Sequence, residues 1–90
     1  NPAKDGINPK IHAEVGVADN VEIKIFNIAA EFVGSANISG ADWLIKDNKY
    51  CYEYPWNVSN IASGVYIYVI KAEKQGYSPI TVIKKCAVIK

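Results

Sequence analysis

The chain has 90 residues, half of them hydrophobic, and its ten basic and nine acidic residues leave a formal net charge of +1. This is the length of one small domain, and the composition is too apolar for a disordered segment. The charge balance gives no field that would attract nucleic acid, and the longest apolar run, Val65 to Ile70, is far shorter than the roughly 18 residues that span a bilayer. We therefore expect one domain over residues 1–90, without a nucleic-acid partner or membrane insertion.

The N-terminal region begins with turn-forming residues. Asn1 to Gly6 and the Asn8-Pro9 pair predict an entry linker over residues 1–9. From Ile11 to Val17 apolar and polar residues alternate, which predicts a strand with one wet face. Asp19-Asn20 then predicts a turn between two antiparallel strands.

The middle of the chain predicts two further strands. Residues 21–28 alternate clearly, with Phe26 and Ile28 on the second face, and residues 31–38 form the next extended stretch. The Ser-Gly-Ala-Asp sequence at residues 39–42 breaks it. Residues 43–49 give no clear pattern beyond a loop tip at Asp47-Asn48-Lys49.

The second half of the chain is the more strongly β-forming half. Residues 50–54 alternate tyrosines with other side chains until Pro55, which marks a strand end or an edge. Residues 60–64 predict a turn. Residues 65–72 are apolar on both faces, which favours a central strand, and residues 80–89 form the last strand.

This pattern gives six or seven strands with turn signals every 8–12 residues or so, and no useful helical period. It predicts an all-β protein, specifically an immunoglobulin-like antiparallel β-sandwich. The chain contains no methionine. We therefore expect it to be a segment excised from a larger protein.

Few residues of the chain indicate a catalytic, phosphate-binding or metal-binding site. His12 is the only histidine, and Glu14 lies two residues on, on the same strand face, where the two could touch. A surface histidine is the simpler interpretation, since a general base would need a partner and a pocket. A dyad of His12 with a cysteine is not favoured, since no third orienting group is evident. No phosphate-binding glycine loop or calcium-loop spacing occurs. We expect no enzyme activity, no metal and no cofactor.

The two cysteines, Cys51 and Cys86, leave two interpretations open. They could form a disulfide, which would stabilise the fold by roughly 3–4 kcal/mol on a chain-entropy estimate. They could equally be two half-buried thiols in strands.

Five aromatic residues gather in one stretch: Trp43, Tyr50, Tyr52, Tyr54 and Trp56. The three tyrosines share one face of an extended strand, and an exposed row of rings could stack on a glycan. The alternatives are that they fill the core or an edge of a small sandwich, or that they contact a partner protein.

Several segments together resemble one bacterial family. Residues 21–33 resemble its "V-x-I-x-I-Y-D-x-x-G-x-x-V" strand pair, although Ala30 stands where the family usually has glycine. Residues 56–68 resemble its "W-(D/N)…L-A-S-G-x-Y-x-Y" turn and strand, residues 84–90 its "K-K-x-x-V-x-K" ending, and Asn1-Pro2 its "Y-P-N-P" entry. The family comprises the C-terminal sorting domains of type IX secretion, with the related immunoglobulin-like domain of the flagellar hook-capping protein.

The most specific of these segments is the turn into the strand at residues 63–66. Here Gly64 is expected to permit a tight turn after Ser63. Tyr66 is expected to supply a large packing residue with a polar tip.

The resemblance implies a function as an address. Such modules are C-terminal, are read by secretion machinery and deliver a larger bacterial protein outside the cell or to its surface. Recognition would then involve the last strand and its lysines, Lys84, Lys85 and Lys90. The alternative is that these lysines only protect an edge strand from aggregation.

Two other functions stay open at this point. One is a fibronectin-like structural or adhesive accessory domain, which would contact neighbouring domains of the parent protein. The other is a carbohydrate-binding module that uses the aromatic residues.

Overall fold

The computed structural model describes residues 3–4 and 8–90, and these residues form strands and no helix. The strands are β1 (Ala3–Lys4), β2 (Lys10–Ala13), β3 (Asn20–Asn27), β4 (Phe32–Ser39), β5 (Leu44–Lys46), β6 (Lys49–Pro55), β7 (Gly64–Glu73) and β8 (Ile80–Ile89). Within the described residues, no helix is therefore available to cross a membrane.

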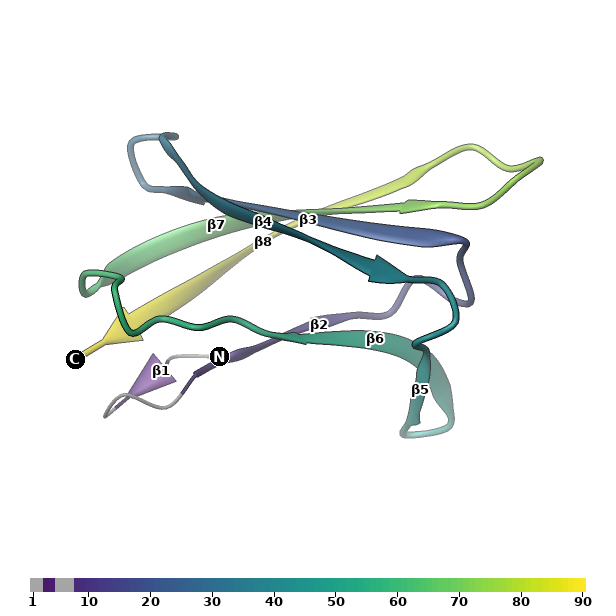
Figure 1. The fold of residues 1–90 in the computed structure, drawn as a ribbon, viewed down its shortest axis with the longest axis horizontal. Helices are drawn as coiled ribbons and strands as arrows, with labels where there is room; N and C mark the ends of the chain where they lie inside the picture. The colour runs from purple at the N-terminus through teal and green to yellow at the C-terminus, as the bar shows by residue number, and fades with distance from the viewer. Residues whose placement is uncertain (1–2, 5–7) are drawn as a thin grey trace.

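The strands form two sheets that lie one over the other (Figure 1). The larger sheet has the order β1-β8-β7-β3-β4 and the smaller sheet has the order β2-β6-β5. Neighbouring strands are antiparallel except for the two-residue β1, which pairs in parallel with the end of β8. The predicted all-β antiparallel sandwich is confirmed, with seven strands of three or more residues among those described.

The core lies between the sheets and follows the period-two alternation of the strands. In β3, Val21, Ile23 and Ile25 are buried while Lys24 is exposed. In β7, every second residue from Tyr66 to Ala72 is buried. As predicted, β7 is a central strand, between β8 and β3.

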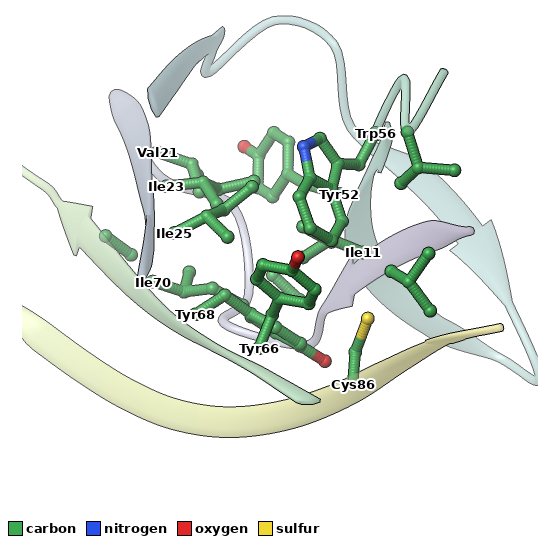
Figure 2. Packing of buried hydrophobic residues seen from close by; sticks show 14 of the residues in the cluster. Ile11, Val21, Ile23, Ile25, Tyr52, Trp56, Tyr66, Tyr68, Ile70 and Cys86 are labelled. Atoms are coloured by element: carbon green, nitrogen blue, oxygen red, sulfur yellow. The ribbon is translucent and has the colours of Figure 1, made fainter. Parts of the chain in front are cut away.

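The smaller sheet closes the core from the other side. Figure 2 shows Tyr66 and Cys86 of the larger sheet pointing towards Ile11, Tyr52 and Trp56. The Trp56 and Tyr66 rings meet edge to face, with their centroids 5.3 Å apart. Full burial of one large apolar side chain stabilises a fold by about 1.5–3 kcal/mol, so these contacts are its main support.

A buried tyrosine hydroxyl joins the loop before β3 to the end of β4. The Tyr52 hydroxyl accepts a hydrogen bond from the Ala18 N–H at 3.0 Å and donates one to the Gly40 carbonyl at 2.8 Å. The Gly40 N–H in turn donates to the Asp19 carbonyl at 3.0 Å. A Cβ at Gly40 would overlap the Ala18 carbonyl oxygen, so this approach requires glycine. We call these residues, 18, 19, 40 and 52, the tyrosine hub.

The first predicted strand is shorter than its alternation suggested. β2 ends at Ala13, and Gly16 has a φ of +72°, which turns the chain out of the strand. The Asp19-Asn20 pair does not join a hairpin, because β2 and β3 belong to different sheets and Asn20 already begins β3. Asp19 instead joins the hub to the far end of β7, by donating its N–H to the Glu73 carbonyl at 2.8 Å.

The unclear stretch over residues 43–49 contains a strand that was not predicted, β5. It pairs with β6 through a two-residue turn at Asp47 and Asn48, whose φ values of 51° and 62° are both positive. That geometry is the type I′ hairpin turn, for which Asp and Asn are suited.

The predicted entry linker is only partly a linker. Ala3 and Lys4 pair with Val88 and Ile89 of β8, and the Pro9 carbonyl accepts a hydrogen bond from the Trp56 N–H at 2.9 Å. Residues 1–2 and 5–7 of the predicted linker lie outside the described residues.

The turn between β3 and β4 is organised by Asn27. Its side-chain oxygen accepts hydrogen bonds from the N–H groups of Ala29 at 3.0 Å and Glu31 at 2.9 Å. Ala30, between them, has a φ of +64°, a left-handed conformation that favours glycine. The turn therefore keeps a glycine-type backbone although the residue is alanine.

Candidate recognition surface

β8 is the last long strand of the larger sheet, and most of one edge is open. Within the described residues, β1 covers this edge only at Val88 and Ile89. The other side pairs with β7 without a bulge, from Ile80 opposite Ala72 to Val88 opposite Gly64. Among the described residues, residues 80–87 therefore form a regular strand with one edge that no other strand covers.

Two of the predicted recognition lysines project from the middle of this strand, to opposite sides. Lys84 lies opposite Tyr68, whose ring faces the core, and Lys85 lies opposite Ile67 on the outer face. Both lysines are exposed, and no ion pair to either is formed by the described residues. Residues 80–90 contain three lysines and no carboxylate, so the charge of this strand is purely positive.

The third predicted lysine, Lys90, is bound to the loop before β7. Its N–H donates to the Ser63 hydroxyl and its ammonium to the Ser59 carbonyl, each at 2.9 Å. Lys90 thus fastens the end of β8, whereas Lys84 and Lys85 are free to meet a partner.

The outer face of the larger sheet is apolar next to these lysines. Phe26 lies opposite Phe32 and Ile67, and the two phenyl rings meet edge to face at 5.9 Å. Further along, Val69 lies opposite Ile83, which is 67% exposed. We call this surface the apolar half; it consists of Phe26, Phe32, Val65, Ile67, Val69, Ile83, Ala87 and Ile89. Exposed apolar patches of this kind commonly mark interaction sites.

The charges within the apolar half are those of Lys24, opposite Val69, and Lys85. Beyond it the same face becomes polar, with Glu22 opposite Lys71, and Glu73 opposite Asn20. The apolar half was not predicted from the sequence. Residues 65–72 are apolar on both faces, and this pattern was interpreted only as that of a central strand.

A small cavity lies beside β2, where residues of β7 and β8 meet its edge. Its volume is about 180 Å³, and it is lined by His12, Ala13, Glu14, Ile70, Val82 and Lys84. Lys84 therefore lies at the boundary between the open edge of β8 and the side of β2.

The smaller sheet carries an ionic cluster on its outer face. His12 contacts Glu53 through Nδ1 at 3.2 Å and Glu14 through Nε2 at 3.0 Å, which confirms the predicted contact with Glu14. Lys46 binds Glu53 at 3.0 Å and holds the pKa of that carboxyl below its usual range, with a smaller contribution from His12. The hydrogen bond from His12 likewise lowers the pKa of Glu14, aided by Lys49. Each carboxylate of the cluster therefore contacts both His12 and a lysine, Lys46 at Glu53 and Lys49 at Glu14.

The five aromatic residues are divided between the core and the surface, and the core-filling alternative holds for two of them. Tyr52 is fully buried and Trp56 is buried in the core, because the tyrosine face of β6 turns inward. Trp43 and Tyr50 remain exposed and meet edge to face at 5.2 Å. Tyr54 is half-buried against the core.

The two cysteines are free thiols and do not form a disulfide. Cys86 belongs to the core cluster, whereas Cys51 alternates with the core residue Tyr52 and so points to the other side of the smaller sheet. Burial raises the pKa of both thiols, which disfavours the reactive thiolate.

The turn before β7 is fixed by side chains rather than by glycine. The Tyr66 hydroxyl donates to the Ala62 carbonyl at 2.6 Å, and Ser63 accepts from Lys90. Gly64 does not have a positive φ, and a Cβ there would meet only the Tyr66 ring at 3.8 Å. The turn at this position therefore does not use the left-handed conformation that glycine favours.

Comparison with known families gives one match. A family model described as "Secretion system C-terminal sorting domain" matches residues 1–85. No curated protein and no solved structure matches the chain, and the second resemblance, to the hook-capping domain, gains no support. Domains of this family mark proteins that are exported to the cell surface or secreted from it. Because the match covers most of the chain and agrees with the β-sandwich fold, the chain belongs to the C-terminal sorting domains of type IX secretion.

Proposed function

We propose that residues 1–90 form the single C-terminal domain of a larger exported protein, and that this domain is a non-catalytic address read by secretion machinery at β8. The proposal is supported by a regular strand with exposed Lys84 and Lys85, whose edge is open among the described residues, in a chain of a sorting-domain family. The apolar half lies beside these lysines and would be covered by the same protein partner.

A non-catalytic role agrees with the chemistry of the reactive side chains. His12 is bound by two carboxylates on the outer face of the smaller sheet. Both cysteines are buried with raised pKa values, so neither is prepared as a nucleophile. Among the residues that the structure describes, no three acidic, histidine or cysteine side chains could together hold a metal ion.

The lysines have separate roles in this proposal. Lys84 and Lys85 contact the partner, whereas Lys90 holds the end of β8 against the loop at Ser59 and Ser63. A purely protective role for Lys84 and Lys85, as guards of an edge strand, is the competing explanation.

The test uses the full-length parent protein in its own host. Lys84→Gln with Lys85→Gln should lower export several-fold while leaving the fold intact, because both side chains are exposed. The matched control is Lys71→Gln with Lys74→Gln, at the polar end of β7 and its loop, which should be exported normally.

A cruder variant removes residues 80–90 altogether. It also removes the buried side chains of Cys86 and Val88, so lost export alone would not separate recognition from folding. Unchanged export of this deletion would contradict the address function and favour a structural accessory domain.

A further inference from the structure

We propose that the partner adds a β-strand to the open edge of β8 at residues 80–87, and that this strand carries adjacent acidic residues. The inference rests on the proposed function and specifies how β8 is read. Strand addition is an established mode of peptide recognition, in which backbone hydrogen bonds supply affinity and alternate side chains supply specificity.

The backbone of β8 is suited to this mode. A strand edge without a neighbour presents unpaired N–H and C=O groups. Residues 80–87 pair with β7 without a register shift, and Pro79 lies before the strand rather than in it. The segment is long enough for an incoming strand of ordinary length, about five or six residues.

The opposite edge of the larger sheet is less suited. β4 lies at that edge, and its pairing with β3 shifts register between Ile25 and Phe26. Residues 32–39 also contain no charged side chain, so nothing there selects a partner by charge. By contrast, β8 pairs with β7 without a register shift and carries charged side chains.

Charge determines which strand β8 accepts. Residues 80–90 carry lysines and no carboxylate, so an acidic strand is attracted. A second copy of this chain is disfavoured. Antiparallel pairing of two β8 edges about the middle of residues 80–87 would bring Lys84 and Lys85 of both copies together.

The side chains of β8 indicate the order of residues in the partner strand. On the outer face, Ile83 and Lys85 favour an apolar residue and then an acidic one. On the inner side, Lys84 borders the cavity of about 180 Å³ and favours a second carboxylate. Glu14 lines the same cavity but is already bound by His12. The expected strand therefore has two adjacent acidic residues flanked by β-branched residues.

The experiment measures amide hydrogen exchange of the isotopically labelled chain by NMR, with two peptide probes. One is capped Thr-Val-Thr-Glu-Glu-Val-Thr-Val, and the matched control has lysines in place of both glutamates. At saturating acidic peptide, exchange at alternate amides of residues 80–87 should slow roughly tenfold, because these amides gain hydrogen-bond partners. The lysine peptide should leave exchange unchanged.

Charge reversal provides the second arm. Lys84→Glu with Lys85→Glu should exchange the preference, so that the lysine peptide protects β8 and the acidic peptide does not. Lys71→Glu with Lys74→Glu is the control and should keep the original preference. Circular dichroism and urea unfolding would verify that both variants are folded.

Three results would overturn strand addition. The first is no slowed exchange with the acidic peptide. The second is a chemical-shift change confined to the apolar half, around Phe32 and Ile67, which would place the peptide on the sheet face. The third is equal protection by both peptides.

The export assay of the proposed function distinguishes strand addition at β8 from the sorting function itself. If the Lys84/Lys85 variant is exported less but the acidic peptide does not slow amide exchange in β8, the sorting function is supported and strand addition is rejected. Protection of β8 with unchanged export would support strand addition and reject the address.

Discussion

The tyrosine hub and the β8 surface differ in how their polar and apolar groups are arranged. At the hub, the Tyr52 hydroxyl joins two chain segments inside the core, and Gly40 leaves no room for a side chain. At β8, Ile83 is 67% exposed and the neighbouring lysines have no ion-pair partner among the described residues. The hub residues thus stabilise the fold, whereas the exposed residues of β8 are available to a partner. Substitutions at the hub should therefore change stability, and substitutions at the exposed residues of β8 should not.

The largest effect is expected from Gly40→Ala. The added Cβ would overlap the Ala18 carbonyl oxygen and lie 2.6 Å from that of Asp19, so backbone must move. We expect a loss of about 3 kcal/mol or more in the free energy of unfolding, measured with urea. Gly34→Ala is the control, because a Cβ there meets nothing within 4 Å. An equal loss at both glycines would show that the hub has no special role.

The second effect is expected from Tyr52→Phe, which removes only the buried hydroxyl. The Ala18 N–H and Gly40 carbonyl would lose their partner, at a cost of about 1–3 kcal/mol. Tyr66→Phe should cost less, because the carbonyl that it releases belongs to the exposed Ala62 and can bind water. If the two variants unfold at the same urea concentration, the buried network does not stabilise the fold beyond ordinary packing.

The third effect is a gain. Ala30→Gly should raise the free energy of unfolding by about 1 kcal/mol, because glycine adopts the φ of +64° without steric cost. Ala29→Gly, one residue earlier and without a positive φ, should lower it. A loss of stability in both variants would contradict the strain assigned to Ala30.

A smaller effect is expected from Glu53→Gln, as a change in how stability depends on pH below about 5. The pKa of Glu53 is lowered in the folded state, mainly by Lys46, so its contribution is present above the unfolded value near 4.3 and disappears as pH falls through the folded value. The free energy of unfolding in urea should therefore fall less for Glu53→Gln than for the wild type when the pH is lowered from about 5 to 3. Parallel pH profiles would show that the cluster does not stabilise the folded state.

The smallest effect is expected from Ile83→Thr on β8. The side chain is mostly exposed and threonine keeps the β-branch, so stability should stay within about 0.5 kcal/mol. A loss above 1 kcal/mol or so, by the same urea assay, would mean that Ile83 already belongs to the core.

The sequence predicted the long strands well because their alternation reports burial directly. The predicted last strand, residues 80–89, has the bounds of β8, and residues 65–72 fall within β7. β5 was missed because three residues are too few to show a period, although the Asp47-Asn48 turn beside it was noticed as a loop tip.

The candidate site was harder to predict, because alternation assigns residues to a face without saying which face is covered. The alternation of residues 50–54 allowed both a core layer and a ligand row, and the structure shows that Tyr52 faces the core. Conversely, the apolar second face of β7 predicted only a central strand, whereas its outward residues lie on the apolar half. Lys84 and Lys85 were identified by resemblance, whereas the bonds that fasten Lys90 depend on tertiary structure.

The arrangement of the two cysteines has a consequence for where the domain can fold. Cys86 points from the larger sheet into the core, whereas Cys51 points to the side of the smaller sheet away from the core, and the two remain free thiols. An exported protein is synthesised in a reducing compartment and works in an oxidising one. The native state has two free thiols, so folding of this domain requires no oxidation step. The domain can therefore fold in the reducing compartment before export or in the oxidising one after it.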